Sequence, residues 1–176
     1  MWTASGFPAF LLLPGLIVGS AGFCRGQRLP AEPEVKERQS VIQKFADEKL
    51  AVWQQRLNLQ EWRISVMIAP ASDLRPQTVG NIHWDSAGRT AVIRILDPAD
   101  YHMAWQPMLQ DMEFTVVHEL IHLELVPLLA DLQRNEASRR DEEFAVNHLA
   151  EALLHLQANT VTQPQSPIGT ATSSAK

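Results

Sequence analysis

An apolar stretch of this chain carries two histidines and one glutamate: Phe114-Thr115-Val116-Val117-His118-Glu119-Leu120-Ile121-His122-Leu123. Its apolar residues predict a buried or half-buried helix. Positions four apart on a helix share a face, so the imidazoles of His118 and His122 point the same way and can bind one ion. Glu119 lies one step round the helix, where its carboxylate can reach a water at that ion without being a ligand. This H-E-x-x-H spacing predicts a metal site with a carboxylate base.

The flanks of the stretch predict where the helix begins and ends. Asp111 and Glu113 lie where a helix N-terminus favours acids, and Asp111 is expected to cap it. Pro127 is expected to end the helix soon after the second histidine. The alternative, a pair of core histidines, requires a separate partner for each buried polar group.

A third protein ligand is expected further along the chain, because catalytic zinc usually takes three protein ligands and a water. An H-x-x-G-x-x-H extension is excluded, because Leu125 and Leu128 occupy its glycine and histidine positions. The next strong helical stretch, 136–156, opens with Asp141-Glu142-Glu143. Its position leaves room for a turn and a returning antiparallel helix that brings an acid back to the histidines.

Two acids of this cluster compete for the ligand position. Glu143 shares a helix face with Asn147, whose amide can hydrogen-bond a ligand histidine and fix its tautomer. Glu142 stays open as the alternative ligand, and His148 is a weaker rival. Either acid can also be a solvated charge near a helix N-terminus.

The segment Glu143-Phe144-Ala145-Val146-Asn147 resembles the E-x-x-x-[DN] segment that gluzincins, the thermolysin-like class, carry on the helix after H-E-x-x-H. The longer run 143–154 is similar to small minigluzincins, which include ImmA/IrrE-like peptidases and compact H-E-x-x-H proteins of phages and prophages. The likeness covers about residues 62–156, and only the two helical motifs are specific. The chain departs from the pattern at Val146 and at Glu124.

The resemblance implies one zinc ion bound by His118, His122 and Glu143. It further implies that Glu119 acts as the general base and that Asn147 supports a ligand from outside the coordination sphere. The implied function is a zinc-dependent metallopeptidase that hydrolyses a peptide or protein substrate. A catalytically silent or narrowly specific metal-binding regulatory module is the alternative, and a structural zinc domain is a third possibility.

Periodicity predicts an α+β domain with a minimal zincin-like layout. An N-terminal helix precedes a small antiparallel sheet of about three strands, which the H-E-x-x-H helix and a C-terminal helix follow. The expected elements are a helix over 35–57, strands over 62–68, 79–84 and 90–96, and a turn at 85–88.

One strand is expected to form an exposed edge that binds an extended peptide. Either 79–84 or 90–96 is a candidate for this edge, and His83 and Trp84 are candidates to face the cleft. Tyr101 or His102 is a candidate to donate a hydrogen bond to the developing oxyanion.

Length and composition limit the number of domains and the classes of partner that the chain can have. A chain of 176 residues suits one domain, and its net charge of −5 with scattered basic residues argues against a nucleic-acid partner. Its single cysteine, Cys24, excludes an internal disulfide framework.

Three segments are expected: 1–28 as a signal peptide or membrane-proximal segment, 29–157 as the domain, and 158–176 as a disordered tail. A signal peptide implies a secreted or periplasmic protein. An uncleaved apolar segment implies a membrane anchor, and an upstream extension implies a cytoplasmic protein.

Overall fold

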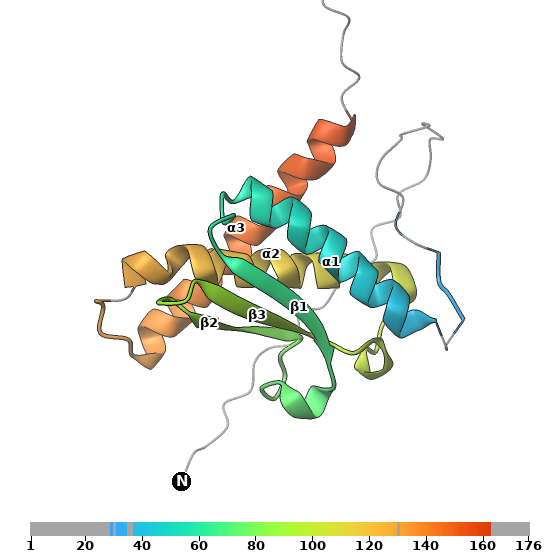
Figure 1. Cartoon of the computed structure of the whole chain (residues 1–176), viewed down its shortest axis with the longest axis horizontal. Coiled ribbons are helices and arrows are strands. Elements are labelled where there is room, and N and C mark those ends of the chain that lie inside the picture. Colours follow the sequence, from blue (N-terminus) through green and yellow to red (C-terminus); the bar gives the residue numbers. More distant parts are fainter. Residues whose placement is uncertain (1–28, 30, 35–36, 130, 163–176) are drawn as a thin grey trace, which may run out of the picture.

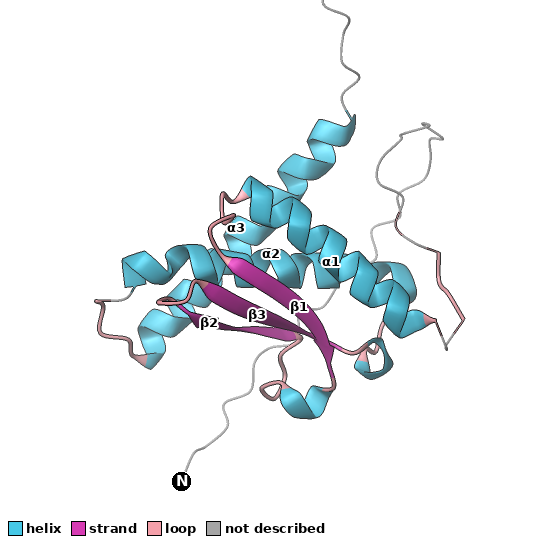
Figure 2. Ribbon diagram, viewed as in Figure 1, coloured by secondary structure: helices cyan, strands magenta, loops and turns pink. Residues whose placement is uncertain are grey.

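The computed structural model describes residues 29, 31–34, 37–129 and 131–162 (Figure 1). Within these residues the predicted α+β class is confirmed: three α-helices surround one face of a three-stranded sheet (Figure 2). The elements are α1 (Arg38–Arg56), β1 (Arg63–Ala69), β2 (Gly80–Asp85), β3 (Thr90–Leu96), α2 (Trp105–Leu129) and α3 (Glu136–Thr162).

The sheet has the strand order β1-β3-β2 and is mixed. β2 pairs antiparallel with β3, as expected of a hairpin, but β1 pairs parallel with β3, which differs from the expected antiparallel sheet. Burial accounts for the order of the strands. Ala91, Ile93 and Ile95 are nearly inaccessible, which suits β3 to the centre. His83 and Asp85 on β2 are exposed, which suits that strand to an edge. Of the two candidates for the edge, β2 therefore lies at an edge of the sheet and β3 lies at its centre.

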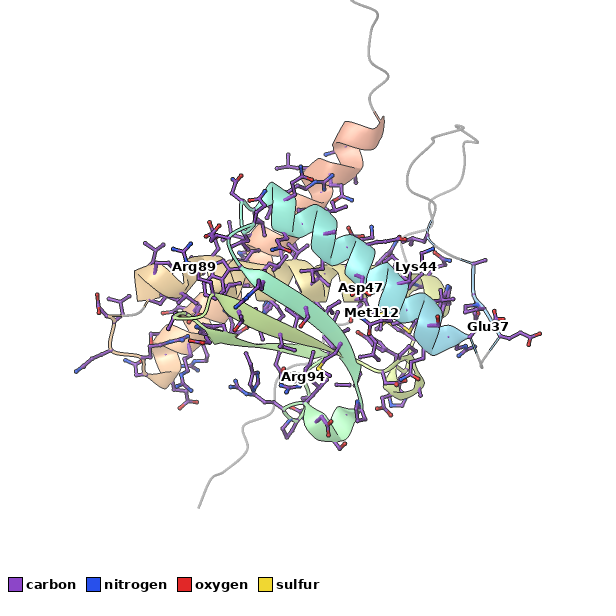
Figure 3. The ribbon with its side chains drawn as sticks, viewed as in Figure 1. Glu37, Lys44, Asp47, Arg89, Arg94 and Met112 are labelled. Carbon is purple, nitrogen blue, oxygen red and sulfur yellow. The ribbon has the colours of Figure 1, made fainter. Side chains whose placement is uncertain are left out.

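The core lies between the sheet and the helices, and α2 runs through its middle. α2 contacts α1, α3, β2 and β3, so it is buried on several sides. Ile42 and Trp53 of α1 and Val146 of α3 pack into the same core. In Figure 3, Lys44 lies on the outer side of α1, where its side chain is exposed. This central position holds α2 rigidly from Met108 to Leu123.

Both predicted limits of the motif helix are wrong. α2 begins at Trp105, so Asp111 lies in its second turn and does not cap it. The apolar residues Trp105 and Met108 extend the buried face toward the N-terminus. Pro127 lies inside the helix, which continues to Leu129. A proline so close to a C-terminus removes one hydrogen bond without breaking the remaining turns.

The C-terminal helix is longer than predicted. α3 continues to Thr162, so residues 158–162 are helical and do not belong to a disordered tail. The predicted segment 1–28 and residues 163–176 lie outside the described residues. Among the helices that the structure describes, none is long and apolar enough to cross a membrane.

Candidate metal centre

Two adjacent helices bring two imidazoles and one carboxylate together. His118 and His122, one turn apart on α2, place their Nε2 atoms 3.0 Å from each other. Glu143 on α3 places Oε2 at 3.3 Å from Nε2 of His118 and Oε1 at 3.5 Å from Nε2 of His122. The structure therefore brings together the three ligands implied by the resemblance, and they form the one such cluster in the described residues.

The spacing of these atoms fits a zinc ion. Bonds of about 2.0–2.1 Å in a tetrahedron separate ligand atoms by about 3.3–3.4 Å. The two Nε2 atoms are 3.0 Å apart, and each lies 3.3 or 3.5 Å from one of the two Glu143 oxygens, so all of these separations are close to that edge length. Two imidazole nitrogens and one carboxylate oxygen are also a donor set that catalytic zinc uses. The residues present therefore fit the metal by both distance and chemistry.

The outer nitrogen of each histidine has its own partner. Nδ1 of His118 lies 3.0 Å from Oδ1 of Asn147, as expected for that residue. Nδ1 of His122 lies 2.9 Å from Oε1 of Glu142. Because both partners are oxygen acceptors, each Nδ1 donates, and each Nε2 presents a lone pair to the shared centre. Two lone pairs and a carboxylate thus converge where a cation would satisfy all three.

Glu142 therefore lies beside the outer nitrogen of His122, whereas Glu143 lies beside both Nε2 atoms. The second oxygen of Glu142 pairs with Arg134 from the connection between α2 and α3. The sequence does not predict the position of Glu142 beside the outer nitrogen of His122. Where acids are consecutive at the start of a helix, the periodicity of the sequence does not show which of them faces a given residue.

The ionisable groups of the centre have shifted pKa values. The neighbouring imidazoles of His118 and His122 hold the pKa of Glu143 well below its usual range. Burial alone would lower the pKa of His122, but the carboxylates of Glu143, Glu119 and Glu142 outweigh it, and the net shift is upward.

Glu119 lies beside the cluster in a buried position, with 7% of its surface exposed. Burial raises the pKa of its carboxyl, while the positive charges of His118, His122 and Arg75 oppose that shift. The edge strand passes close to it: a Cβ added to Gly80 would lie 3.5 Å from Oε1 of Glu119. The carboxylate thus sits between the histidines and the start of β2.

These groups line a cavity of about 450 Å³. One wall is β2 with the loop before it, and the other walls are α2 and the first turns of α3. His83 and Trp84 line the cavity, as predicted, and Trp84 is 40% exposed.

Other sequence candidates do not reach the centre. Tyr101 and His102 do not line the cavity. The Tyr101 hydroxyl instead donates to Oδ2 of Asp111 at 3.0 Å, and burial raises the pKa of Tyr101 far above its usual range. His148 is exposed and makes an edge-to-face contact with Phe144, with ring centroids 4.0 Å apart, and it does not line the cavity.

The cavity also contains three arginines that the sequence did not single out: Arg75, Arg134 and Arg139. Exposed arginines in a loop or at the start of a helix have no pattern that distinguishes them from solvated surface charges. Only their position around the cavity in the fold marks them.

Comparison of the chain with protein-family models, with curated proteins and with solved structures finds no match. The likeness to gluzincins therefore depends on the two helical motifs and on the site geometry described above.

Proposed function

We propose that the protein is a zinc-dependent metallopeptidase of the gluzincin type. The observation that carries this proposal is the convergence of His118, His122 and Glu143 at zinc-like separations, with the buried carboxylate of Glu119 beside them. A metal-binding module that does not cleave peptides needs no such buried acid.

His118, His122 and Glu143 would hold the ion. Zinc in such a site supplies Lewis acidity that polarises a carbonyl group and acidifies a water. The carboxylate of Glu119 accepts the proton of the attacking water and then delivers it to the departing amine. Its raised pKa suits both steps, because the carboxyl takes up a proton more readily than an exposed glutamate.

The edge strand supplies the binding surface for the substrate. Within the part of the chain that the structure describes, the backbone of β2 is paired with β3 on one side only, so its other side offers amide and carbonyl groups to a further strand. An extended peptide that adds to this edge runs past Glu119, because Gly80 brings β2 into close contact with α2.

The test separates metal binding from hydrolysis. Glu119→Gln should bind one zinc per chain, as the parent does, and lose peptide hydrolysis by about two to four orders of magnitude. His118→Ala should lose both zinc and hydrolysis. Unchanged cleavage by Glu119→Gln would refute the assignment of the base. Zinc binding by the parent without cleavage of any peptide would favour the regulatory module.

A further inference from the structure

Of the four carboxylates that line the cavity, three have a polar partner and the fourth, that of Glu119, is buried. Asp111 accepts a hydrogen bond from Tyr101, and Glu142 is shared by His122 and Arg134. Glu143 lies between the two histidines, and Glu119 is buried beside them. The cavity therefore has no spare acid to neutralise a further cation.

Two arginines of the cavity lack an acidic partner. Arg134 pairs with Glu142, whereas the guanidinium groups of Arg75 and Arg139 make no ion pair within the described part of the chain. Both residues are exposed, so their charges are open to an incoming molecule. The charge of Arg75 nevertheless reaches Glu119 across the cavity.

The two free arginines lie near opposite ends of the edge strand. Arg75 belongs to the loop that precedes β2, and Arg139 lies one turn before Glu143 on α3. In Figure 1 that loop meets one end of β2, and the first turns of α3 lie near its other end. A six-residue strand spans about 20 Å, so groups near its two ends can contact an extended peptide at residues on both sides of a bond held between them.

The balance of charge in the cavity favours an anionic ligand once the metal is bound. Four carboxylates against three guanidinium groups leave one net negative charge, and a divalent ion reverses this to one net positive charge. The whole chain carries a net charge of −5, so this positive region differs in sign from the rest of the molecule.

We propose that the cavity selects acidic peptides, with Arg75 and Arg139 binding carboxylate side chains on the two sides of the scissile bond. This inference rests on the proposed peptidase function. The carboxylates lie within about three residues of the cleaved bond, because each residue of an extended peptide advances by about 3.3 Å. Guanidinium groups suit this role, since they bind carboxylates through two parallel hydrogen bonds.

The first experiment is a cleavage profile. The zinc-loaded full chain is incubated with a library of natural peptides, and the cleaved bonds are read by mass spectrometry. Asp and Glu should be enriched on both sides of the cleaved bonds. For a cleaved peptide, replacement of one such Glu by Gln should lower kcat/KM by about tenfold or more. Cleavage without preference for acids would overturn the inference and leave the peptidase proposal intact.

Charge reversal identifies the residues. Arg75→Glu and Arg139→Glu should each shift the preference on one side from acidic to basic residues. Arg140→Glu is the matched control, because Arg140 is exposed on the same helix, does not line the cavity and undergoes the same change of charge. An equal loss of kcat on all peptides in Arg75→Glu, with no shift of preference, would contradict a role in specificity.

A binding measurement separates the two proposals. Zinc-loaded Glu119→Gln is titrated with a fluorescent acidic peptide and with its Gln-substituted analogue, and anisotropy is followed. Tighter binding of the acidic peptide, weakened by Arg75→Glu and by added salt, would support the inference even if the parent cleaved nothing. Equal binding of the two peptides, or binding of neither, would refute it.

Discussion

Nδ1 of His118 on α2 lies 3.0 Å from Oδ1 of Asn147 on α3. This hydrogen bond connects the two helices that supply the proposed metal ligands. It fixes the proton of His118 on Nδ1, so Nε2 is free to bind a cation. The packing of α3 on α2 and the protonation state of the ligand are therefore set by one contact.

Asn147→Ala is expected to lower zinc affinity by about 10- to 100-fold, because His118 loses the group that orients its ring. Zinc dissociation constants measured by competition with a chelator check this. Glu151→Ala, at an exposed position of the same helix, is the control and should leave the affinity unchanged. Equal affinities for Asn147→Ala and the parent would show that the hydrogen bond does not orient the ligand.

Alanine substitutions at the two neighbouring acids should have different effects. Glu143→Ala removes a ligand and should abolish stoichiometric zinc binding. Glu142→Ala removes only the partner of His122 Nδ1, so the zinc should stay bound with an affinity lower by about 10- to 100-fold. Metal content after gel filtration gives the answer. The reverse pattern would mean that Glu142 is the ligand.

Zinc should stabilise the protein more as the pH rises from about 5.5 to about 8. The pKa of His122 is raised in the metal-free fold above its value in the unfolded chain. Protonated His122 therefore stabilises the metal-free fold at pH values below the unfolded pKa, and this stability is lost as the pH rises through the folded pKa. Zinc must displace that proton, and so the gain in Tm on adding zinc is smallest in acid. Thermal melts with and without zinc measure it, and a gain independent of pH would exclude His122 as a ligand.

A buried ion pair joins α1 to α2 on the side away from the cavity. Lys49 Nζ lies 2.6 Å from Oε2 of Glu113, and Trp53 Nε1 donates to Oε1 of the same carboxylate. Lys49→Met should lower the free energy of unfolding by about 3–5 kcal/mol, because it leaves a buried charge without its partner. Adding Glu113→Gln should recover much of this loss. Lys44→Met, at an exposed site on α1, should change stability by less than about 0.5 kcal/mol. Urea denaturation tests all three variants, and an equally small effect at Lys49 would contradict the buried pair.

Gly80 determines how closely β2 approaches α2. A Cβ at this position would lie 2.3 Å from Cγ2 of Thr115 and 3.0 Å from the carbonyl oxygen of Arg94. Gly80→Ala should therefore lower stability by about 1–3 kcal/mol and lower kcat/KM, because the edge strand must move away from Glu119. Thr115→Ser removes the methyl group and should restore part of both losses in the double variant. The rescue is partial because the contact with the Arg94 backbone remains. A double variant no better than Gly80→Ala would refute the steric explanation.

The sequence predicts the local elements well. The alternation of Trp62 to Ile68 and of Thr90 to Leu96 locates β1 and β3 within a residue or two. The pairing of β1 with β3 in parallel is not a local property. This pairing depends on which strand the helices bury. The sequence pattern alone does not contain that information, and it suggests a simple antiparallel sheet. The start of α2 was missed because the acids at 111 and 113 resemble a helix beginning, whereas in the fold each has a partner on another element.

In the candidate site, too, the sequence predicts the local features but not those that depend on the packing of separate elements. The spacing of His118 and His122 places them on one face of one helix, whatever the rest of the fold. The choice between Glu142 and Glu143 requires the packing of α3 on α2, because both acids lie at the start of that helix. The positions of Arg75 and Arg139 depend on three separate elements meeting around one cavity, which no single stretch of sequence encodes.

Pro127 gives the end of α2 a separate behaviour. Its missing amide leaves the carbonyl of Leu123 without the usual helical donor, and Leu128 just beyond it is 71% exposed. We therefore expect the backbone after Leu123 to open locally at low energetic cost, and the amides around the two histidines to exchange with solvent only when the core itself unfolds. Arg134 lies in the connection between α2 and α3. Local opening of this connection would therefore leave the relative positions of the two imidazoles unchanged.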